Sequence, residues 1–177
     1  MSVRVWTPTV GEAEKMLPIV ELMRRLSDHR LSTGDLLMKE LDLLGFERLQ
    51  LKVPARRDVV KFAAPSIHKK DDVTVLVTQG VGQDAGRNYA SLSVTVTDKS
   101  APLAQAVADV SQWLGAEPEY PARGAQFAVL ENGAERTPIS LSETAEWHER
   151  PMGSLVHMNV DDMGSGVSIM RILTKAV

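Results

Sequence analysis

Two runs of alternating apolar and polar residues constrain the fold of this chain more than any other feature. In residues 73–78 a valine stands at every second position, and in residues 90–97 alanine, leucine and valine alternate with serine and threonine. A strand with this period of two has one apolar and one polar face. Such strands are typical of antiparallel sheets, because strands of parallel sheets are usually apolar on both faces. The two runs therefore predict an antiparallel hairpin.

The segment between these runs contains Gly80, Gly82 and Gly86, which raises the question of phosphate binding. A dinucleotide-binding loop needs a helix directly after its glycines, since the helix N-terminus supplies amide donors to the pyrophosphate. Here the alternating run follows instead, and no lysine is followed by serine or threonine at the spacing of a P-loop. The glycines are therefore interpreted as a turn.

The expected turn, residues 80–88, is long for a hairpin, because most hairpin loops contain roughly two to five residues. Long loops that carry mixed charges often contact ligands or partners. Gln83, Asp84 and Arg87 are therefore the candidate binding residues of the sequence. A solvated hairpin loop is the alternative interpretation.

The N-terminal part of the chain is expected to form two helices. In residues 7–30 the apolar residues recur at intervals of three and four, which is the spacing of a helix with one buried face. Pro18 lies inside this stripe and is expected to kink the helix or to delay its start. A second helix is expected to begin near Ser32 and to end at Gly45. Together the two predict a helical hairpin.

Two further helices are expected later in the chain. Residues 103–114 repeat the helical spacing, with Ser100 expected as the N-cap and Gly115 as the end. A short helix is expected to start at a capping box formed by Ser140 and Glu143. The longer of the two carries the clearest apolar stripe and is expected to pack on the sheet.

The remaining segments are mostly interpreted as strands. Residues 49–53 and 59–63 follow the period of strands, whereas residues 65–72 are expected to be a polar connection. The pair Asn132-Gly133 predicts a hairpin with a type I′ turn, because both residues tolerate positive φ angles. A further hairpin is expected with its turn at residues 161–165.

The order of these elements predicts an α+β fold. We expect a mostly antiparallel β-sheet of about six to eight strands, with the N-terminal helical hairpin and the central amphipathic helix packed on it. The 177 residues are expected to form a single domain, residues 1–177, since one core commonly reaches this size.

Composition limits the compartment and the chemistry. The net charge is -3, and 44% of the residues are hydrophobic, as in ordinary folded proteins. The absence of cysteine excludes disulfides and thiolate nucleophiles and fits a reducing compartment. No apolar run reaches the roughly 18 residues that span a bilayer. We therefore expect a soluble, cytoplasmic protein with no membrane partner.

No catalytic or metal-binding motif stands out. Zinc sites need three or four converging ligands, usually with two at short spacing, and the histidines are scattered. The acidic residues around the turn at Gly164 lack the regular ligand ladder of an EF-hand. We therefore predict no metal and no cofactor, and the catalytic residues, if any exist, stay unidentified. The histidines are His29, His68, His148 and His157.

Basic clusters on this chain are small and few. The negative net charge of -3 and the small number of aromatic residues that could stack on bases disfavour nucleic-acid binding. A local basic patch formed by two of the clusters is the alternative. The clusters are Arg24-Arg25 with Arg30, Arg56-Arg57 with Lys61, and Lys69-Lys70.

The sequence favours a non-enzymatic protein-binding or assembly module, in an accessory, immunity-like or structural role. This prediction depends on the missing catalytic motifs and on sheet edges that can pair with another chain. The expected partner is another protein or a second copy, which would give a homo-oligomer. The alternative is a small-ligand-binding domain or a small hydrolase-type enzyme with a pocket between sheet and helices.

Overall fold

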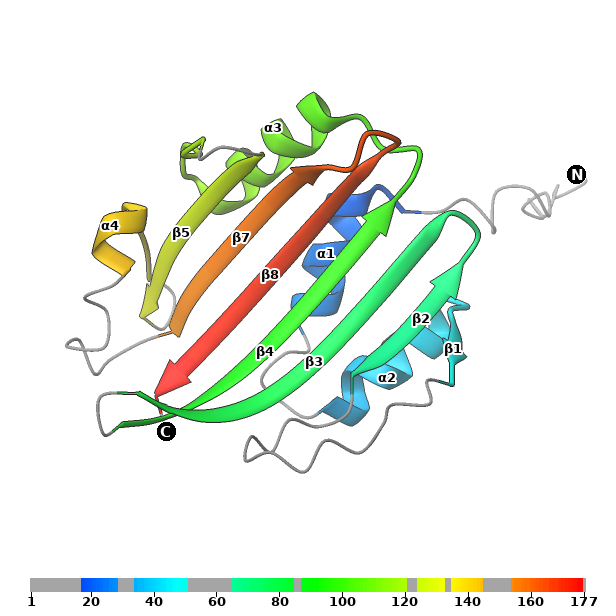
Figure 1. Ribbon diagram of the computed structural model, residues 1–177, viewed down its shortest axis with the longest axis horizontal. Helices are drawn as coiled ribbons and strands as arrows, with labels where there is room; N and C mark the ends of the chain where they lie inside the picture. Colours follow the sequence, from blue (N-terminus) through cyan, green and yellow to red (C-terminus); the bar gives the residue numbers. More distant parts are fainter. Residues whose placement is uncertain are drawn as a thin grey trace, which may run out of the picture.

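The computed structural model describes residues 17–28, 34–50, 65–84, 87–120, 124–132, 135–144 and 154–176. Within these residues the chain forms one sheet of eight antiparallel strands with helices packed on it (Figure 1). The predicted α+β fold class is confirmed. In chain order the elements are α1 (Ile19–Asp28), α2 (Gly34–Leu43), β1 (Glu47–Leu49), β2 (Ser66–Lys70), β3 (Val73–Asp84), β4 (Arg87–Asp98), α3 (Leu103–Leu114), β5 (Ala125–Asn132), β6 (Glu135–Pro138), α4 (Leu141–Thr144), β7 (Ser154–Asp162) and β8 (Val167–Ala176).

The strand order places the C-terminal strand inside the sheet. The order is β1-β2-β3-β4-β8-β7-β5-β6, and each neighbouring pair is antiparallel. Strand β8 therefore joins the half of the sheet that contains β1 to β4 to the half that contains β5 to β7 (Figure 1). Because β8 is central, its inward side chains reach helices of both halves, as Arg171 reaches Trp113 of α3.

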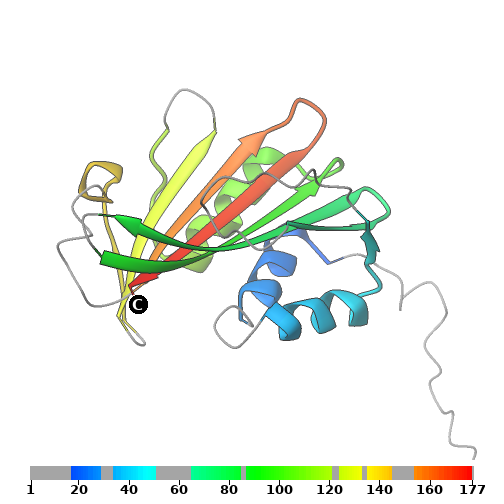
Figure 2. The same ribbon diagram turned by 60° about the horizontal axis from the view of Figure 1, so that its bottom comes forward.

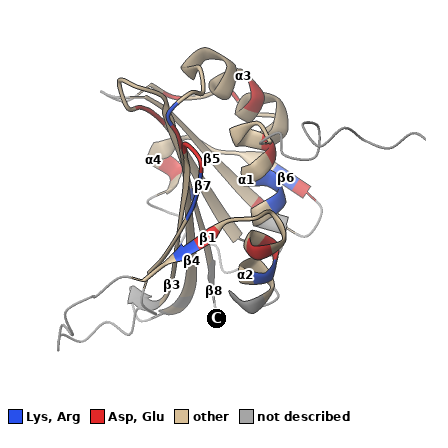
Figure 3. Ribbon diagram, turned by 90° about the vertical axis from the view of Figure 1, so that its right-hand side faces the viewer, with Lys and Arg blue, Asp and Glu red and all other residues tan. Residues whose placement is uncertain are grey.

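Helices α1, α2 and α3 cover one face of the sheet, whereas the short helix α4 lies on the other face (Figures 2 and 3). Helix α1 contacts β4 and β8, and α3 contacts β5 and β7. The helices and the inward strand residues bury a common apolar core. Burial of these side chains is the main force that holds the helices on the sheet. Fully buried members of the core include Met23, Leu26, Val75, Val96, Phe127 and Ile169.

The two alternating runs form neighbouring strands, as predicted. Val75 stands opposite Val96 and Val77 opposite Val94, and all four side chains are buried beneath the helices. Leu76 and Thr95, which lie between them, are partly exposed on the other face. The period of two in the sequence therefore predicts correctly which face of these strands is buried and which is partly exposed.

The predicted nine-residue loop at residues 80–88 is wrong. Strand β3 continues to Asp84 and β4 begins at Arg87, with Gly80 opposite Ser91 and Asp84 opposite Arg87. Glycine accepts extended as well as turn conformations, and pairing between the two backbones satisfies their hydrogen-bonding groups. The connection between the strands is therefore only residues 85–86, a usual length for a hairpin.

The predicted polar connection at residues 65–72 is also wrong, because β2 lies within it. Ser66 and His68 alternate toward the core, and the Ser66 hydroxyl lies 3.2 Å from His68 Nε2. Lys70 donates from Nζ to the carbonyl of Leu44 at 2.8 Å. The inward positions of this strand are polar and have local partners, so apolar periodicity could not identify it.

The helix ends near Pro18 and Gly45 agree with the sequence. Helix α1 begins directly after Pro18, whose carbonyl accepts a 2.9 Å hydrogen bond from the amide of Leu22. The described part of the helix therefore starts after Pro18, while residues 7–16, which decide between a delayed start and a kink, lie outside the described residues. Helix α2 ends at Gly45 with a φ of 83°, and the Phe46 amide donates to the Leu41 carbonyl, as in a Schellman motif.

The start of α3 differs from the prediction, whereas its end agrees. Pro102 occupies the N-cap, and no side chain caps the helix there. The amide and hydroxyl of Ser100 both donate to Asp98 Oδ1 at 2.8 Å, so Ser100 shapes the turn before the helix instead of capping it. Gly115 ends α3 in the left-handed conformation with a φ of 64°.

The later hairpins and the short helix form with small differences in register. Asn132 pairs with Glu135 as the last residue of β5, so the turn residues are 133–134, which lie outside the described residues. The turn between β7 and β8 is confirmed. At α4 the Ser140 amide donates to Glu143 Oε2 at 2.8 Å, which is one half of the expected capping box, while the Ser140 hydroxyl donates to the same carboxylate oxygen and does not accept from the Glu143 amide. Residues 51–53, 59–63 and 145–149 lie outside the described residues.

Candidate functional site

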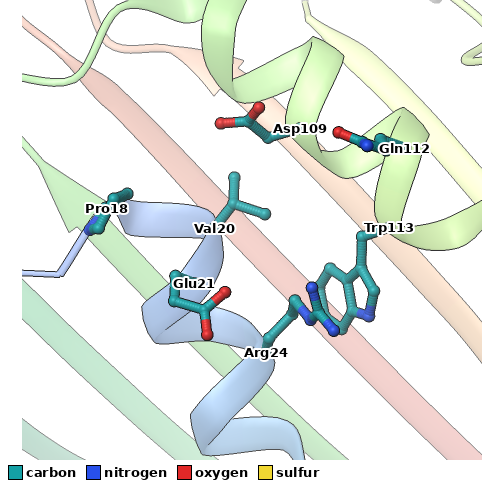
Figure 4. A pocket seen from close by; sticks show the side chains of 7 residues that line it. All are labelled: Pro18, Val20, Glu21, Arg24, Asp109, Gln112 and Trp113. Atoms are coloured by element: carbon teal, nitrogen blue, oxygen red, sulfur yellow. The ribbon is translucent and has the colours of Figure 1, made fainter.

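A hollow between α1 and α3 has a volume of about 490 Å³ and opens on the helical side of the sheet (Figure 4). One wall comes from the start of α1 and the other from the last turns of α3. The lining mixes carboxylates, a guanidinium, an amide and an indole with two apolar side chains. The lining residues are Pro18, Val20, Glu21, Arg24, Asp109, Gln112 and Trp113.

The period of α1 places its polar residues along this hollow. Met23 and Leu26 are fully buried against the sheet, whereas Glu21 and Arg24 are exposed. Residues three or four apart lie on the same side of a helix. The apolar stripe that attaches α1 to the sheet therefore leaves Glu21 and Arg24 together on the side that faces the hollow.

Helix α3 forms the opposite wall in the same way. Val110 and Leu114 are buried, whereas Gln112 is exposed and Trp113 is partly exposed. Asp109 accepts a 2.8 Å hydrogen bond at Oδ1 from the side-chain amide of Gln105, one turn earlier. This bond fixes the carboxylate on the wall of the hollow.

Trp113 forms one end of the hollow and is held by cations. The guanidinium carbon of Arg24 lies 6.0 Å from the centroid of the indole ring, and that of Arg171 lies 4.8 Å from it. Both distances are in the range of cation–π attraction. Figure 4 shows Arg24 against the indole, with the Glu21 and Asp109 side chains farther along the hollow. The ring is therefore a fixed aromatic surface at one end.

A buried ionic network supports Trp113 from the sheet. Arg171 is only 1% exposed, and its Nη2 lies 3.6 Å from Oε1 of Glu131, which is itself buried. Arg136 of β6 contacts the same Glu131 oxygen at 3.1 Å and donates to the backbone oxygen of Trp113 at 3.3 Å. The network connects β8, β5 and β6 to the last turn of α3 and so fixes the indole in place.

A second hollow of about 490 Å³ lies beyond Gln112, at the C-terminal end of α3. Gln112 lines both hollows, so it stands on the rim between them. The charged residue of the second hollow is Glu117. The two hollows extend the available surface along α3.

Two histidines have perturbed ionisation, and neither lines the hollow between α1 and α3. Burial lowers the pKa of His68, Arg48 lowers it further, and Asp42 acts in the opposite direction. Burial alone lowers the pKa of His157, which lies on the opposite face of the sheet. Among the described residues, His68 Nδ1 and His157 Nε2 have no hydrogen-bond partner. Protonation of either ring therefore opposes the folded state.

Acidification from pH 7 to pH 5 is expected to lower the free energy of unfolding. Both histidines have folded pKa values below the ordinary value of 6.5, so their neutral forms favour the fold above that pH. As the pH falls toward the folded values, the unfolded chain binds more protons and stability is lost. Urea unfolding at several pH values checks this, and His68→Gln with His157→Gln should flatten the profile. An unchanged profile in the double variant would contradict it.

The structure does not bring Gln83, Asp84 and Arg87 into the hollow. They lie at the far end of the β3–β4 hairpin, where Gln83 pairs with Asn88 and Asp84 with Arg87. In the sequence, Trp113 belongs to the apolar stripe of residues 103–114, and Arg24 belongs to a basic cluster. Their shared position depends on how two helices pack, which a helical period does not specify.

The part of the chain that the structure describes contains no group of three or more histidine or acidic residues that could hold a metal ion. Among its helices, none is long and apolar enough to cross a membrane. The outer strands β1 and β6 are short and exposed, and β6 contains Pro138.

Comparisons with known proteins give no further assignment. The chain matches no protein family, no curated protein and no solved structure. A proposal for its function therefore rests on its own residues, above all on those that line the hollow between α1 and α3.

Proposed function

We propose that this protein is a non-enzymatic binding module that holds another protein in the hollow between α1 and α3. This hollow, lined by Trp113 and Arg24 among others, forms a binding groove. The observation that carries the proposal is the partly exposed Trp113 in an open groove, fixed by Arg24 and Arg171. Tryptophan and arginine supply much of the binding energy at protein interfaces. A fixed indole also costs little ordering entropy when a partner binds.

The polar character of the groove supports a protein partner. Its walls carry Glu21, Arg24, Asp109 and Gln112 around a single indole. Small-molecule sites are mostly apolar and enclose their ligand, whereas protein interfaces combine an aromatic anchor with a polar rim. The lining residues resemble the second kind of surface more closely than the first.

The edges of the sheet give less support for binding by strand addition. Strand β1 spans only Glu47–Leu49, and β6 spans Glu135–Pro138 with two charged residues and a proline. Short edges with charges and proline are devices that prevent pairing with another chain. We therefore assign partner binding to the helical groove and not to these edges.

The compartment and the identity of the partner belong to the same proposal. The absence of cysteine supports a reducing compartment such as the cytoplasm. If the bound protein is a second copy of the chain, the two copies form a homo-oligomer. The volume of about 490 Å³ also lies within the range of small-ligand sites, so a small-ligand-binding domain is the second candidate. Native mass spectrometry of protein purified from its source separates these three occupants by mass.

Photo-cross-linking from the groove tests the proposal. A benzoylphenylalanine at the exposed rim residue Gln112 should trap one discrete protein in cells of the natural source, because the probe lies beside the bound partner. The control position is Lys69, which is exposed on β2 and points away from the helical layer. A protein trapped equally from both positions, or from neither, would contradict the proposal.

A further inference from the structure

We propose that two copies of this chain pack face to face through the side of the sheet opposite α1, α2 and α3. This inference goes beyond the proposed function, because the surface involved lies on the other face of the sheet from the groove. It is carried by an uncovered sheet face with an apolar centre, by the charge pattern of that face, and by its area.

The central strands have no described helix over their outer face. Figure 1 looks onto this face, with α1, α2 and α3 behind the sheet and no described element in front of β3, β4, β8 and β7. The short helix α4 contacts β5 instead. Side chains that point outward from the centre of these strands are therefore free to meet another molecule.

The middle of this face is apolar. Leu76 of β3 stands opposite Thr95 of β4, and Thr95 stands opposite Met170 of β8 on its other side. Ile172 follows two residues farther along β8, opposite Ser93. All five side chains are partly exposed. An apolar group on three neighbouring strands therefore lies open among small hydroxyl side chains.

Charge is confined to the margin of the face. Among the described outward side chains of β3, β4, β8 and β7, Asp161 at the end of β7 is the only aspartate, glutamate, lysine or arginine. Burial lowers the pKa of His157, so this ring in the middle of β7 is uncharged at neutral pH. Protein interfaces have the same anatomy, with a centre depleted of charge and a polar rim.

A second copy is the partner that this chemistry fits. A charged partner surface would lose its hydration against an uncharged sheet and find no opposite charge there. The helical side of the chain is such a surface, since Glu21, Arg24 and Arg25 are exposed on α1. Two-fold symmetry instead brings the same uncharged patch onto itself. The copies are therefore expected to meet sheet to sheet, as the layers of a β-sandwich do.

The face is also large enough for a stable dimer. Strand β7, the shortest of the four, spans 9 residues. At about 4.8 Å between strands and about 3.3 Å per residue, four such strands cover on the order of 600 Å² in projection. Side-chain relief enlarges the accessible area, so the face approaches the roughly 800 Å² that each partner buries in a standard interface. Packed this way, the copies keep both grooves on the outside, and the dimer presents two binding sites.

Sedimentation velocity of the full chain over a range of concentrations tests the inference. The protein is expected to sediment at twice the mass of one chain at micromolar concentration and to dissociate on dilution. Thr95→Lys should weaken dimerisation at least about 30-fold, because neither copy offers the buried ammonium group an anionic partner. Ala104→Lys adds the same charge at an exposed position of α3 and is the matched control, with dimerisation expected to be unchanged.

Methionine methyl NMR of the unsubstituted chain gives a second measurement, which does not depend on how a variant folds. With a soluble paramagnetic agent, the Met170 methyl signal should be shielded at high protein concentration and become accessible on dilution. Met163, which is 57% exposed, lies in the turn between β7 and β8 and should be accessible at both concentrations. Met170→Leu and Met163→Leu assign the two signals.

Three results would overturn the inference. The first is a chain that stays monomeric, with Met170 equally accessible at every concentration, which would leave this face to a different protein or to water. The second is a dimer that persists in folded Thr95→Lys protein. The third is a dimer that is lost in Trp113→Ala but kept in Thr95→Lys, which would place the contact between copies in the groove. Cross-linking from Gln112 tests the proposed function separately, so the two proposals fail independently.

Discussion

Replacement of Arg171 by alanine is expected to lower the free energy of unfolding by about 3–5 kcal/mol. The substitution removes a guanidinium that is 1% exposed and leaves the carboxylate of Glu131 in the interior without this partner. It also removes the support beneath the indole of Trp113. A buried charge that loses its partner is strongly destabilising, because the interior does not solvate it. Urea unfolding measures the loss.

Two comparisons identify the cause of this loss. Arg136→Ala removes the more exposed partner of the same Glu131 and is expected to cost roughly 1 kcal/mol or less. Arg171→Met combined with Glu131→Leu removes both charges and should recover most of the stability, since apolar residues often replace a buried ion pair without loss. A double variant as unstable as Arg171→Ala would show that the network is not the reason.

Replacement of Gly166 by alanine is expected to destabilise the fold by at least about 3 kcal/mol. Gly166 has a φ of 117°, a conformation that side chains disfavour. A Cβ at this position would overlap the carbonyl oxygen of Asp98 and the backbone of Lys99. Those atoms end β4, which pairs with β8, so neither backbone can move without breaking the central pairing. Thermal and urea unfolding check the effect.

Gly164 provides the matched control in the same turn. It also has a positive φ, 78°, but no atom lies within 4 Å of its would-be Cβ. Gly164→Ala is therefore expected to cost only the strained conformation, about 1–2 kcal/mol. Equal losses for the two variants would mean that close backbone approach at Gly166 does not matter.

The fold was predictable where side-chain periodicity and burial agree. The valines of residues 73–78 alternate because one face of β3 is buried, and Gly45 and Gly115 end helices because each adopts a positive φ. The sequence did not predict strand β2, because its inward residues Ser66 and His68 are polar and contact each other. The sequence also did not predict that β3 continues through Gly80, because pairing with β4 overrides the turn preference of glycine.

The candidate site was much less predictable than the fold. Arg24 and Trp113 are far apart in sequence, and they meet because two helices pack side by side on a sheet. Arg171 lies on an apolar strand and gives no sign that it contacts the indole from below. The residues that sequence did favour, Gln83, Asp84 and Arg87, belong to a regular hairpin. Their role in binding stays a prediction.

The most direct test of the central claim is the cross-linking yield from position 112 with and without Trp113. If the groove binds a protein through this indole, Trp113→Ala should reduce the discrete adduct at least about ten-fold, as expected for an interface anchor. Circular dichroism and urea unfolding of the variant establish that it is folded. An undiminished adduct from a folded Trp113→Ala protein would contradict the claim that Trp113 is the anchor.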